Sequence, residues 1–149
     1  WFVEGADVAR IPATIATFPA GRQADLWSGV GLACAYAGGV ERAALETLRD
    51  TAGSYRPHLA QGVAFAAKTR QRAGNPAEHT ALACTILCEI SHDAAVESAD
   101  VALQALPPDG VVPAYEVWRQ RIQTDWKHRM TPSSRRGDRA GSIAYYSIE

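Results

Sequence analysis

Apolar side chains recur along this chain at the helical period of about 3.6 residues, and the strict alternation typical of β-strands is almost absent. The first such segment places apolar residues on one face between Val8 and Phe18. Asp7 is a candidate N-cap for this segment, but a proline inside a helix costs about 3 kcal/mol or more. We therefore expect Pro12 to kink this helix or to mark its first turn.

Six further helices are separated by short breaker segments. Gly38 and Gly39 resemble a glycine C-cap, and Pro57 suits the first turn of a helix. Residues 74–76 (Gly-Asn-Pro) and 107–110 (Pro-Pro-Asp-Gly) are turn sequences. The pattern predicts helices over residues 22–37, 41–51, 57–73, 77–90, 93–106 and 113–130. Together with the first segment they indicate an all-α fold of about seven helices.

A weak internal echo indicates how these helices are arranged. Residues Leu26, Gly29, Val30 and Ala33 recur 33 positions later as Leu59, Gly62, Val63 and Ala66. A pair of helices repeated at this period is typical of stacked helical hairpins. The echo lacks the tryptophan and tyrosine positions of a tetratricopeptide repeat, and coincidence in an alanine-rich chain explains it equally well. An internal duplication therefore stays open.

Length and charge narrow the class of protein. The 149 residues suit one domain with a real core, and 15 Lys and Arg against 16 Asp and Glu lack the basic excess of a nucleic-acid-binding protein. No apolar run is long enough to span a membrane. Three cysteines fit a reduced compartment better than a disulfide framework. We expect a cytoplasmic protein that binds neither nucleic acid nor membrane.

The two ends of the chain differ from its middle. The chain opens on Trp1-Phe2-Val3 and its only methionine is Met130, so we expect a piece of a longer protein. Residues 113–149 hold seven Arg or Lys against four acids, and the segment after Met130 lacks apolar periodicity. We expect a helical domain over residues 1–130 and a basic, disordered tail over residues 131–149.

One predicted helix carries His79, Cys84 and Cys88, with His92 just beyond it, and these residue types bind zinc. At helical spacing Cys84, Cys88 and His92 share a stripe, but His79 lies off it, so one ion cannot take all four. The remaining positions are apolar on every side, which is typical of a buried helix whose cysteines act as small hydrophobic side chains. We expect no metal and no cofactor.

The most suggestive polar stretch runs over residues 55–62, near a predicted helix N-terminus. There His58 and Gln61 can hold an anionic or carbonyl group, and His58 can act as a general acid or base. The alternative is a solvated helix face on which His58 bonds to a neighbouring loop. The polar stripe in question consists of His58, Gln61, Phe65, Lys68 and Arg72.

Two acids near the start of the chain form a second candidate. Glu4 and Asp7 lie within one turn of the first helix start, where acids commonly cap a helix and interact favourably with its dipole. They can equally form a pair of carboxylates that faces a cavity. Capping is the simpler interpretation.

Four segments together carry a family resemblance: residues 1–7 (WFVEGAD), 25–33 (DLWSGVGLA), 55–62 (YRPHLAQG) and 113–119 (PAYEVWR). They resemble a bacterial family of unknown function that is associated with enediyne polyketide gene cassettes in actinomycetes. The resemblance covers residues 1–123, and the chain looks like the C-terminal half of a family protein. No catalytic residues of that family carry over to this chain.

The resemblance implies an accessory protein of enediyne-type polyketide biosynthesis that binds or processes a polyketide intermediate in a helical cavity. The alternative is a non-catalytic helical-repeat scaffold that binds other proteins. Whether the chain is an enzyme stays open. The expected partners are the intermediate and the missing N-terminal half of the same protein, and a homo-oligomer stays open. The candidate catalytic residues are His58 and Glu4. The candidate ligand-binding residues are Arg56, Gln61, Trp27 and Tyr55, and the expected cavity aromatics are Trp27, Tyr36 and Phe65.

Overall fold

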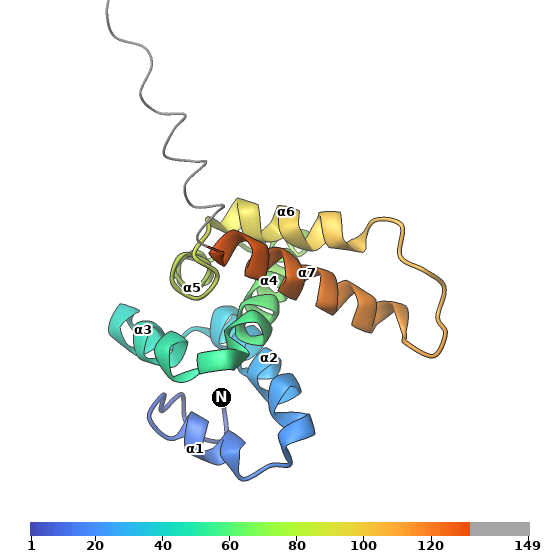
Figure 1. The fold of residues 1–149 in the computed structure, drawn as a ribbon. Helices are drawn as coiled ribbons and strands as arrows, with labels where there is room; N and C mark the ends of the chain where they lie inside the picture. Colours follow the sequence, from blue (N-terminus) through green and yellow to red (C-terminus); the bar gives the residue numbers. More distant parts are fainter. Residues whose placement is uncertain (132–149) are drawn as a thin grey trace, which may run out of the picture.

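This computed structural model describes residues 1–131 of the chain. That part contains seven α-helices joined by short connections (Figure 1). No strand occurs in that part, so the all-α prediction is confirmed. The predicted bounds agree with the observed bounds to within three residues, except that the helix predicted over residues 77–90 is α5 followed by a π-helical turn at Cys84–Cys88. The predicted tail lies outside the described residues, apart from Thr131. The helices are α1 (Ile11–Ala16), α2 (Ala20–Ala37), α3 (Arg42–Thr51), α4 (Arg56–Arg72), α5 (Glu78–Ala83), α6 (His92–Leu103) and α7 (Ala114–Met130).

The first helix begins where its proline allows. α1 starts at Ile11, so Pro12 lies in the first turn, where its missing N–H is not needed. Asp7 does not cap this helix, because the N-cap residue is Arg10 and no side chain accepts a capping hydrogen bond at this end of α1. The Asp7 carboxylate instead accepts a hydrogen bond from the backbone N–H of Ala9, at 3.0 Å. Asp7 therefore closes the turn that precedes α1.

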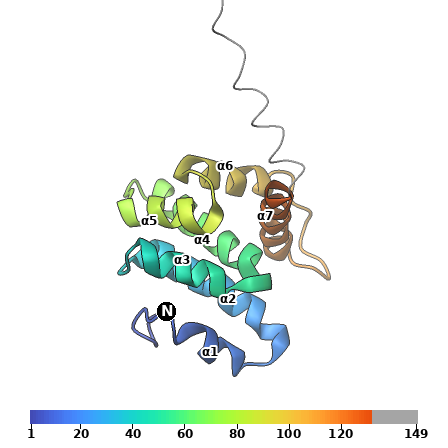
Figure 2. The ribbon, with the colours of Figure 1, turned by 60° about the vertical axis from the view of Figure 1, so that its left-hand side comes forward.

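The helices after α1 start at regular intervals. α2, α4 and α6 start at residues 20, 56 and 92, and α3, α5 and α7 start at residues 42, 78 and 114, so counterparts in successive hairpins start 36 residues apart. The connections share the spacing, because Gly38, Gly74 and Gly110 recur at the same interval. Figure 2 shows the resulting layers, with α1 at the bottom, α2 with α3 next, then α4 with α5, and α6 at the top. The predicted stack of helical hairpins is confirmed.

The centre of the stack is a close crossing of α2 and α4. A Cβ atom built on Gly62 would lie 2.0 Å from the carbonyl oxygen of Ser28, and one built on Gly31 would lie 2.1 Å from that of Leu59. No side chain fits between backbones that approach this closely. The buried apolar core extends from this crossing on both sides, from Leu48 of α3 to Ile122 of α7.

The 33-residue echo does not mark equivalent positions in the hairpins. It pairs Gly29 with Gly62, but a Cβ built on Gly29 would meet nothing within 4 Å, because Gly29 lies on an exposed face of α2. The observed interval is also 36 residues and not 33. The regular spacing of the helices is thus the stronger sign of an internal repeat.

The third hairpin departs from the first two. α7 packs against α4 as well as against α6, and it lies at a different side of the stack from α3 and α5 (Figure 2). Its inward face carries Arg119, Ile122, Gln123 and Trp126, which places polar groups of α7 against α4. This departure creates the polar contacts of the candidate site.

The cysteines are buried. The segment after α5 continues as a π-helical turn over Cys84–Cys88 and not as the regular α-helix that the periodicity predicts. Burial raises the pKa of the Cys34 and Cys84 thiols to about 12 and that of Cys88 well above its usual value. These thiols are therefore protonated at neutral pH and act as small apolar side chains. Within residues 1–131 no group of three or more His, Cys, Asp or Glu side chains is placed to hold a metal ion.

Candidate functional site

A buried glutamine is the centre of a polar cluster where α2, α4 and α7 meet. Gln61 of α4 is fully buried, and its Oε1 accepts hydrogen bonds from Ser28 Oγ at 2.8 Å, Arg119 Nε at 3.2 Å and Gln123 Nε2 at 3.4 Å. A solvated helix face is therefore wrong as an interpretation of Gln61, because α7 covers it. We call Asp25, Ser28, Gln61, Arg119 and Gln123 the Gln61 cluster.

Arg119 connects this cluster to the surface. Only 12% of its side chain is exposed, and its two terminal nitrogens bond to Asp25 of α2 at 2.9 Å and to Glu116 at 2.8 Å. Burial by itself lowers the pKa of Arg119, but the hydrogen bond to Asp25 and the charge of Glu116 outweigh it and the pKa is raised. Every nitrogen of the guanidinium thus has an acceptor, which is how a largely buried cation is tolerated.

His58 lies beside the cluster on the first turns of α4. Burial and the positive charges of Lys127 and Arg119 lower the pKa of His58, against the opposing charges of Asp25 and Glu116. The side chain is therefore mostly neutral at pH 7, the state in which imidazole can accept a proton. Its Nδ1 is buried and bonds to no residue within 1–131, so the predicted bond to a neighbouring loop is not found at that nitrogen.

Tyr55, the residue that precedes α4, lies between the rings of Trp27 from α2 and His58 from α4. The Trp27 and Tyr55 rings stack with centroids 6.4 Å apart, and the His58 ring lies 6.3 Å from that of Tyr55. Arg56 forms an ion pair with Glu89, and its guanidinium lies over the ring of Trp126. The structure therefore places Tyr55 next to His58, whereas Arg56 contacts Glu89 and Trp126.

Glu4 lies apart from this region, at a hollow between α1 and α2. Thr14 Oγ1 donates a hydrogen bond to Glu4 Oε1 at 2.7 Å, and Arg10 forms an ion pair with the other carboxylate oxygen at 3.1 Å. Glu4 therefore fixes the N-terminal segment to α1 and does not cap that helix. The other carboxylate that lines the hollow is Asp25, and Asp7 does not line it, so the predicted pair of Glu4 and Asp7 is not formed there.

The hollow beside Glu4 is mostly apolar. Its volume is about 330 Å³, and its walls come from the N-terminal segment, α1 and α2. Asp25 lies at the opposite wall from α1 and also bonds to Arg119, so this residue belongs both to the hollow and to the Gln61 cluster. The apolar lining includes Trp1, Val3, Ile11, Ile15, Phe18, Leu26 and Val30.

The three aromatic residues expected in one cavity lie in three different places. Trp27 is buried in the core, whereas Tyr36 is partly exposed with the guanidinium of Arg70 over its ring, at 4.5 Å. Phe65 contacts the ring of Trp118, with centroids 4.5 Å apart. The expected single cavity with these three walls is therefore wrong. The sequence pattern of one helix does not indicate which neighbouring helix packs against its aromatic side chains.

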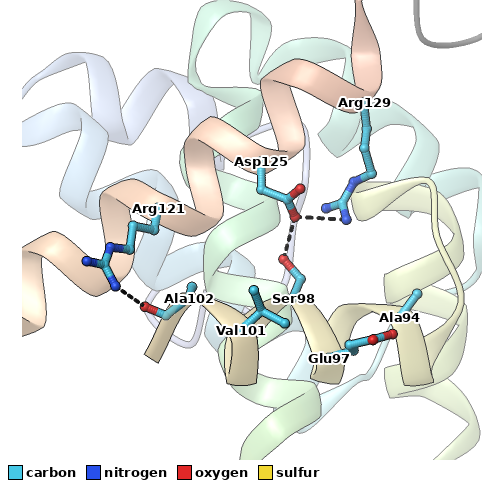
Figure 3. A pocket seen from close by; sticks show the side chains of 8 residues that line it. All are labelled: Ala94, Glu97, Ser98, Val101, Ala102, Arg121, Asp125 and Arg129. Carbon is cyan, nitrogen blue, oxygen red and sulfur yellow. Dashed lines mark hydrogen bonds and ion pairs between the residues drawn. The ribbon is translucent and has the colours of Figure 1, made fainter. Parts of the chain in front are cut away.

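A second hollow lies between α6 and α7, with a volume of about 380 Å³ (Figure 3). Here Ser98 Oγ donates to Asp125 Oδ2 at 2.7 Å, and Arg129 forms an ion pair with the same oxygen at 2.9 Å. Arg121 donates to the carbonyl oxygens of Ala102 and Gln104 at the end of α6. These polar groups hold the two helices together, so they are largely committed to one another.

Sequence reasoning missed Asp25, Ser28 and Arg119. Each is separated from Gln61 by at least one helix, and Arg119 is 94 positions from Asp25. The one available signal was their location inside the segments that carry the family resemblance, residues 25–33 and 113–119.

The model of a family described as "Protein of unknown function (DUF1702)" matches residues 1–126. No curated protein and no solved structure matches the chain. Among the described residues no helix has both the length and the apolar character needed to cross a bilayer.

Proposed function

We propose a ligand-binding role for this chain, which belongs to the family described as "Protein of unknown function (DUF1702)". It is an accessory protein of enediyne-type polyketide biosynthesis that binds an apolar polyketide intermediate in the hollow between α1 and α2. The observation that carries the proposal is the apolar lining of that hollow, with Glu4 at its wall. The polyketide class comes from the sequence resemblance of residues 1–123.

The size and lining of the hollow suit a small apolar ligand. Its volume of about 330 Å³ lies in the range of known small-molecule sites, about 300–1,000 Å³. Each of its two carboxylates forms an ion pair, Glu4 with Arg10 and Asp25 with Arg119. An uncharged polyketide carries no charge that would have to be dehydrated when it enters the hollow. Burial of its apolar surface therefore favours binding.

Of the two candidate catalytic residues, only Glu4 lines this hollow. His58 lies at the α4–α7 contact, next to the Gln61 cluster. The proposal is therefore for binding, and it assigns Glu4 the role of fixing the wall of the site through Thr14 and Arg10.

Glycine positions in α2 provide a direct test. Gly29 lines the hollow, and a Cβ built on it meets nothing within 4 Å, so Gly29→Phe fills the site without disturbing the core. Gly21 is equally unobstructed but lies outside the hollow, so Gly21→Phe is the matched control. We expect Gly29→Phe to weaken binding of the uncharged polyene diphenylhexatriene at least about tenfold, measured by its fluorescence, and Gly21→Phe to leave it unchanged. Equal binding by both variants contradicts the proposal.

The biosynthetic part needs a separate experiment in an enediyne-producing strain. Replacing the native gene by one that encodes Gly29→Phe should lead to accumulation of an intermediate in mass spectra of culture extracts, and Gly21→Phe should not. An unchanged product profile in both strains contradicts the biosynthetic role even if the polyene binds.

Exposed apolar residues at the N-terminus favour a second candidate, the protein-binding scaffold. Phe2 and Val3 are 75% and 92% exposed beside the hollow. In that case Phe2→Ser with Val3→Ser abolishes association with a partner protein, whereas Gly29→Phe does not affect polyene binding.

A further inference from the structure

A third hollow lies beside α4, and the proposed function does not use it. Its volume is about 220 Å³. Its lining combines the ring of Phe65 from α4, the rings of Tyr115 and Trp118 from α7, and Leu32 and Leu103 from α2 and α6. Four helices thus contribute to one small site.

The three rings form a fixed apolar wall. The Phe65 and Trp118 centroids are 4.5 Å apart, and Tyr115 lies 5.9 Å from Phe65 and 6.3 Å from Trp118, edge-on to the latter. Trp118 Nε1 donates to the carbonyl oxygen of Ala99 at 2.8 Å, which fixes the orientation of the indole. The wall is open to a ligand, because Tyr115 is 57% exposed and Leu32 and Leu103 are exposed as well.

The rim of this hollow is basic. Lys68 and Arg72 of α4 both line it, and no acid does. Lys68 is neutralised by Asp100, at 2.7 Å. The guanidinium of Arg72 forms no ion pair or hydrogen bond with any residue that the structure describes. The positively charged guanidinium of Arg72 and its unused hydrogen-bond donors therefore lie at the same hollow as the three aromatic rings.

We propose that this hollow binds a planar aromatic carboxylate. The rings of Phe65, Tyr115 and Trp118 accept the flat face or edge of an aryl group, and the planar guanidinium of Arg72 matches a carboxylate in two-pronged geometry. The volume is below that of sites for drug-sized ligands, so the ligand has one or two rings. The site is separate from the hollow between α1 and α2 and does not depend on the function proposed for it.

A pair of matched ligands separates the contribution of the rings from that of Arg72. The ligands are 2-naphthoate and the uncharged 2-naphthalenemethanol, titrated into the full chain by calorimetry. We expect naphthoate to bind about five- to tenfold more tightly than the alcohol, the size of a charge-assisted hydrogen bond at a partly exposed site. Arg72→Gln removes this difference, and Arg22→Gln, at an exposed arginine of α2 outside the hollow, retains it. Tyr115→Ala weakens both ligands.

Three outcomes overturn the proposal. The first is the absence of saturable naphthoate binding up to about 5 mM. The second is equal affinity for the acid and the alcohol in the native protein, which means an apolar surface without carboxylate recognition. The third is equal naphthoate affinity in the Arg72→Gln and native proteins. Circular dichroism and thermal unfolding check that Arg72→Gln is folded, which we expect because Arg72 is exposed at the last turn of α4.

Discussion

The α2–α4 crossing and the α6–α7 contact both join neighbouring helices of the stack, but different atoms form the two contacts. At the first, backbone lies on backbone at Gly31 and Gly62. At the second, side chains such as Ser98 and Asp125 hold the helices together and leave a hollow of about 380 Å³. Two helix contacts in one stack therefore differ in the atoms that form them, backbone at the first and side chains at the second.

This difference separates a rigid region from an adaptable one. Backbone atoms in contact cannot move aside for an added methyl group, whereas surface side chains can change rotamer. We therefore expect the two contacts to respond very differently to substitutions of similar size.

The largest effect is expected at the α2–α4 crossing. Gly62→Ala places a Cβ 2.0 Å from the Ser28 carbonyl oxygen, so the helices must separate, and we expect a loss of about 3 kcal/mol or more in the free energy of unfolding. Urea denaturation followed by circular dichroism measures it. The control is Gly29→Ala on the exposed face of α2, which should stabilise the protein by about 0.5–1 kcal/mol. Similar stabilities of the two variants would contradict the close crossing.

A smaller loss is expected at the Gln61 cluster, which adjoins the same crossing. Gln61→Leu keeps most of the volume but removes the acceptor of Ser28, Arg119 and Gln123. We expect a loss of about 2–3 kcal/mol, because buried donors are left without a partner. Gln71→Leu, on the exposed end of α4, should change the free energy of unfolding by less than about 0.5 kcal/mol. Equal losses would show that Gln61 contributes no polar contact.

The smallest loss in the free energy of unfolding is expected when a charge is removed at the α6–α7 contact. Asp125→Asn weakens the ion pair with Arg129 but keeps an acceptor for Ser98. Because Asp125 and Arg129 are both partly exposed, we expect a loss of only about 0.5–1 kcal/mol. A loss as large as that of Gly62→Ala would end the contrast between the two contacts.

A pH titration extends the comparison to the α4–α7 contact, with an effect that is absent at neutral pH. The pKa of His58 is lowered from 6.5 in the folded protein, so protonation favours the unfolded state. Stability therefore falls as the pH drops below about 6.5 towards the lowered pKa. His58→Gln should lose this part of the pH dependence, measured as the difference in unfolding free energy between the two proteins. Identical curves would show that burial does not perturb His58.

The helix bounds were predictable because the breakers are local. Pro12, the Gly38-Gly39 pair and residues 107–110 end or start helices through backbone geometry that needs no tertiary contact. The π-helical turn at Cys84–Cys88 could not be predicted, because the period of the apolar residues alone does not distinguish a π-helical turn from an α-helix.

The candidate site was predictable only in part. His58, Gln61 and Tyr55 were identified as a group because they lie within two turns of one helix. That Gln61 is buried depends on α7, which packs against α4 although Arg119 lies 58 positions beyond Gln61. Asp25 and Arg119 were missed for the same reason, because their pairing joins positions that no local pattern relates.

The pairing of Arg119 with Asp25 also has a consequence for the order of folding. Most contacts in a stack join neighbouring hairpins, a low contact order that is typical of fast folding. This ion pair spans 94 positions and closes the longest loop of the cluster. As the chain leaves the ribosome, α2 and α4 emerge before α7. Gln61 therefore lacks its hydrogen bond from Arg119 until α7 has been synthesised. A nascent chain that ends before α7 therefore lacks the contact that completes the site.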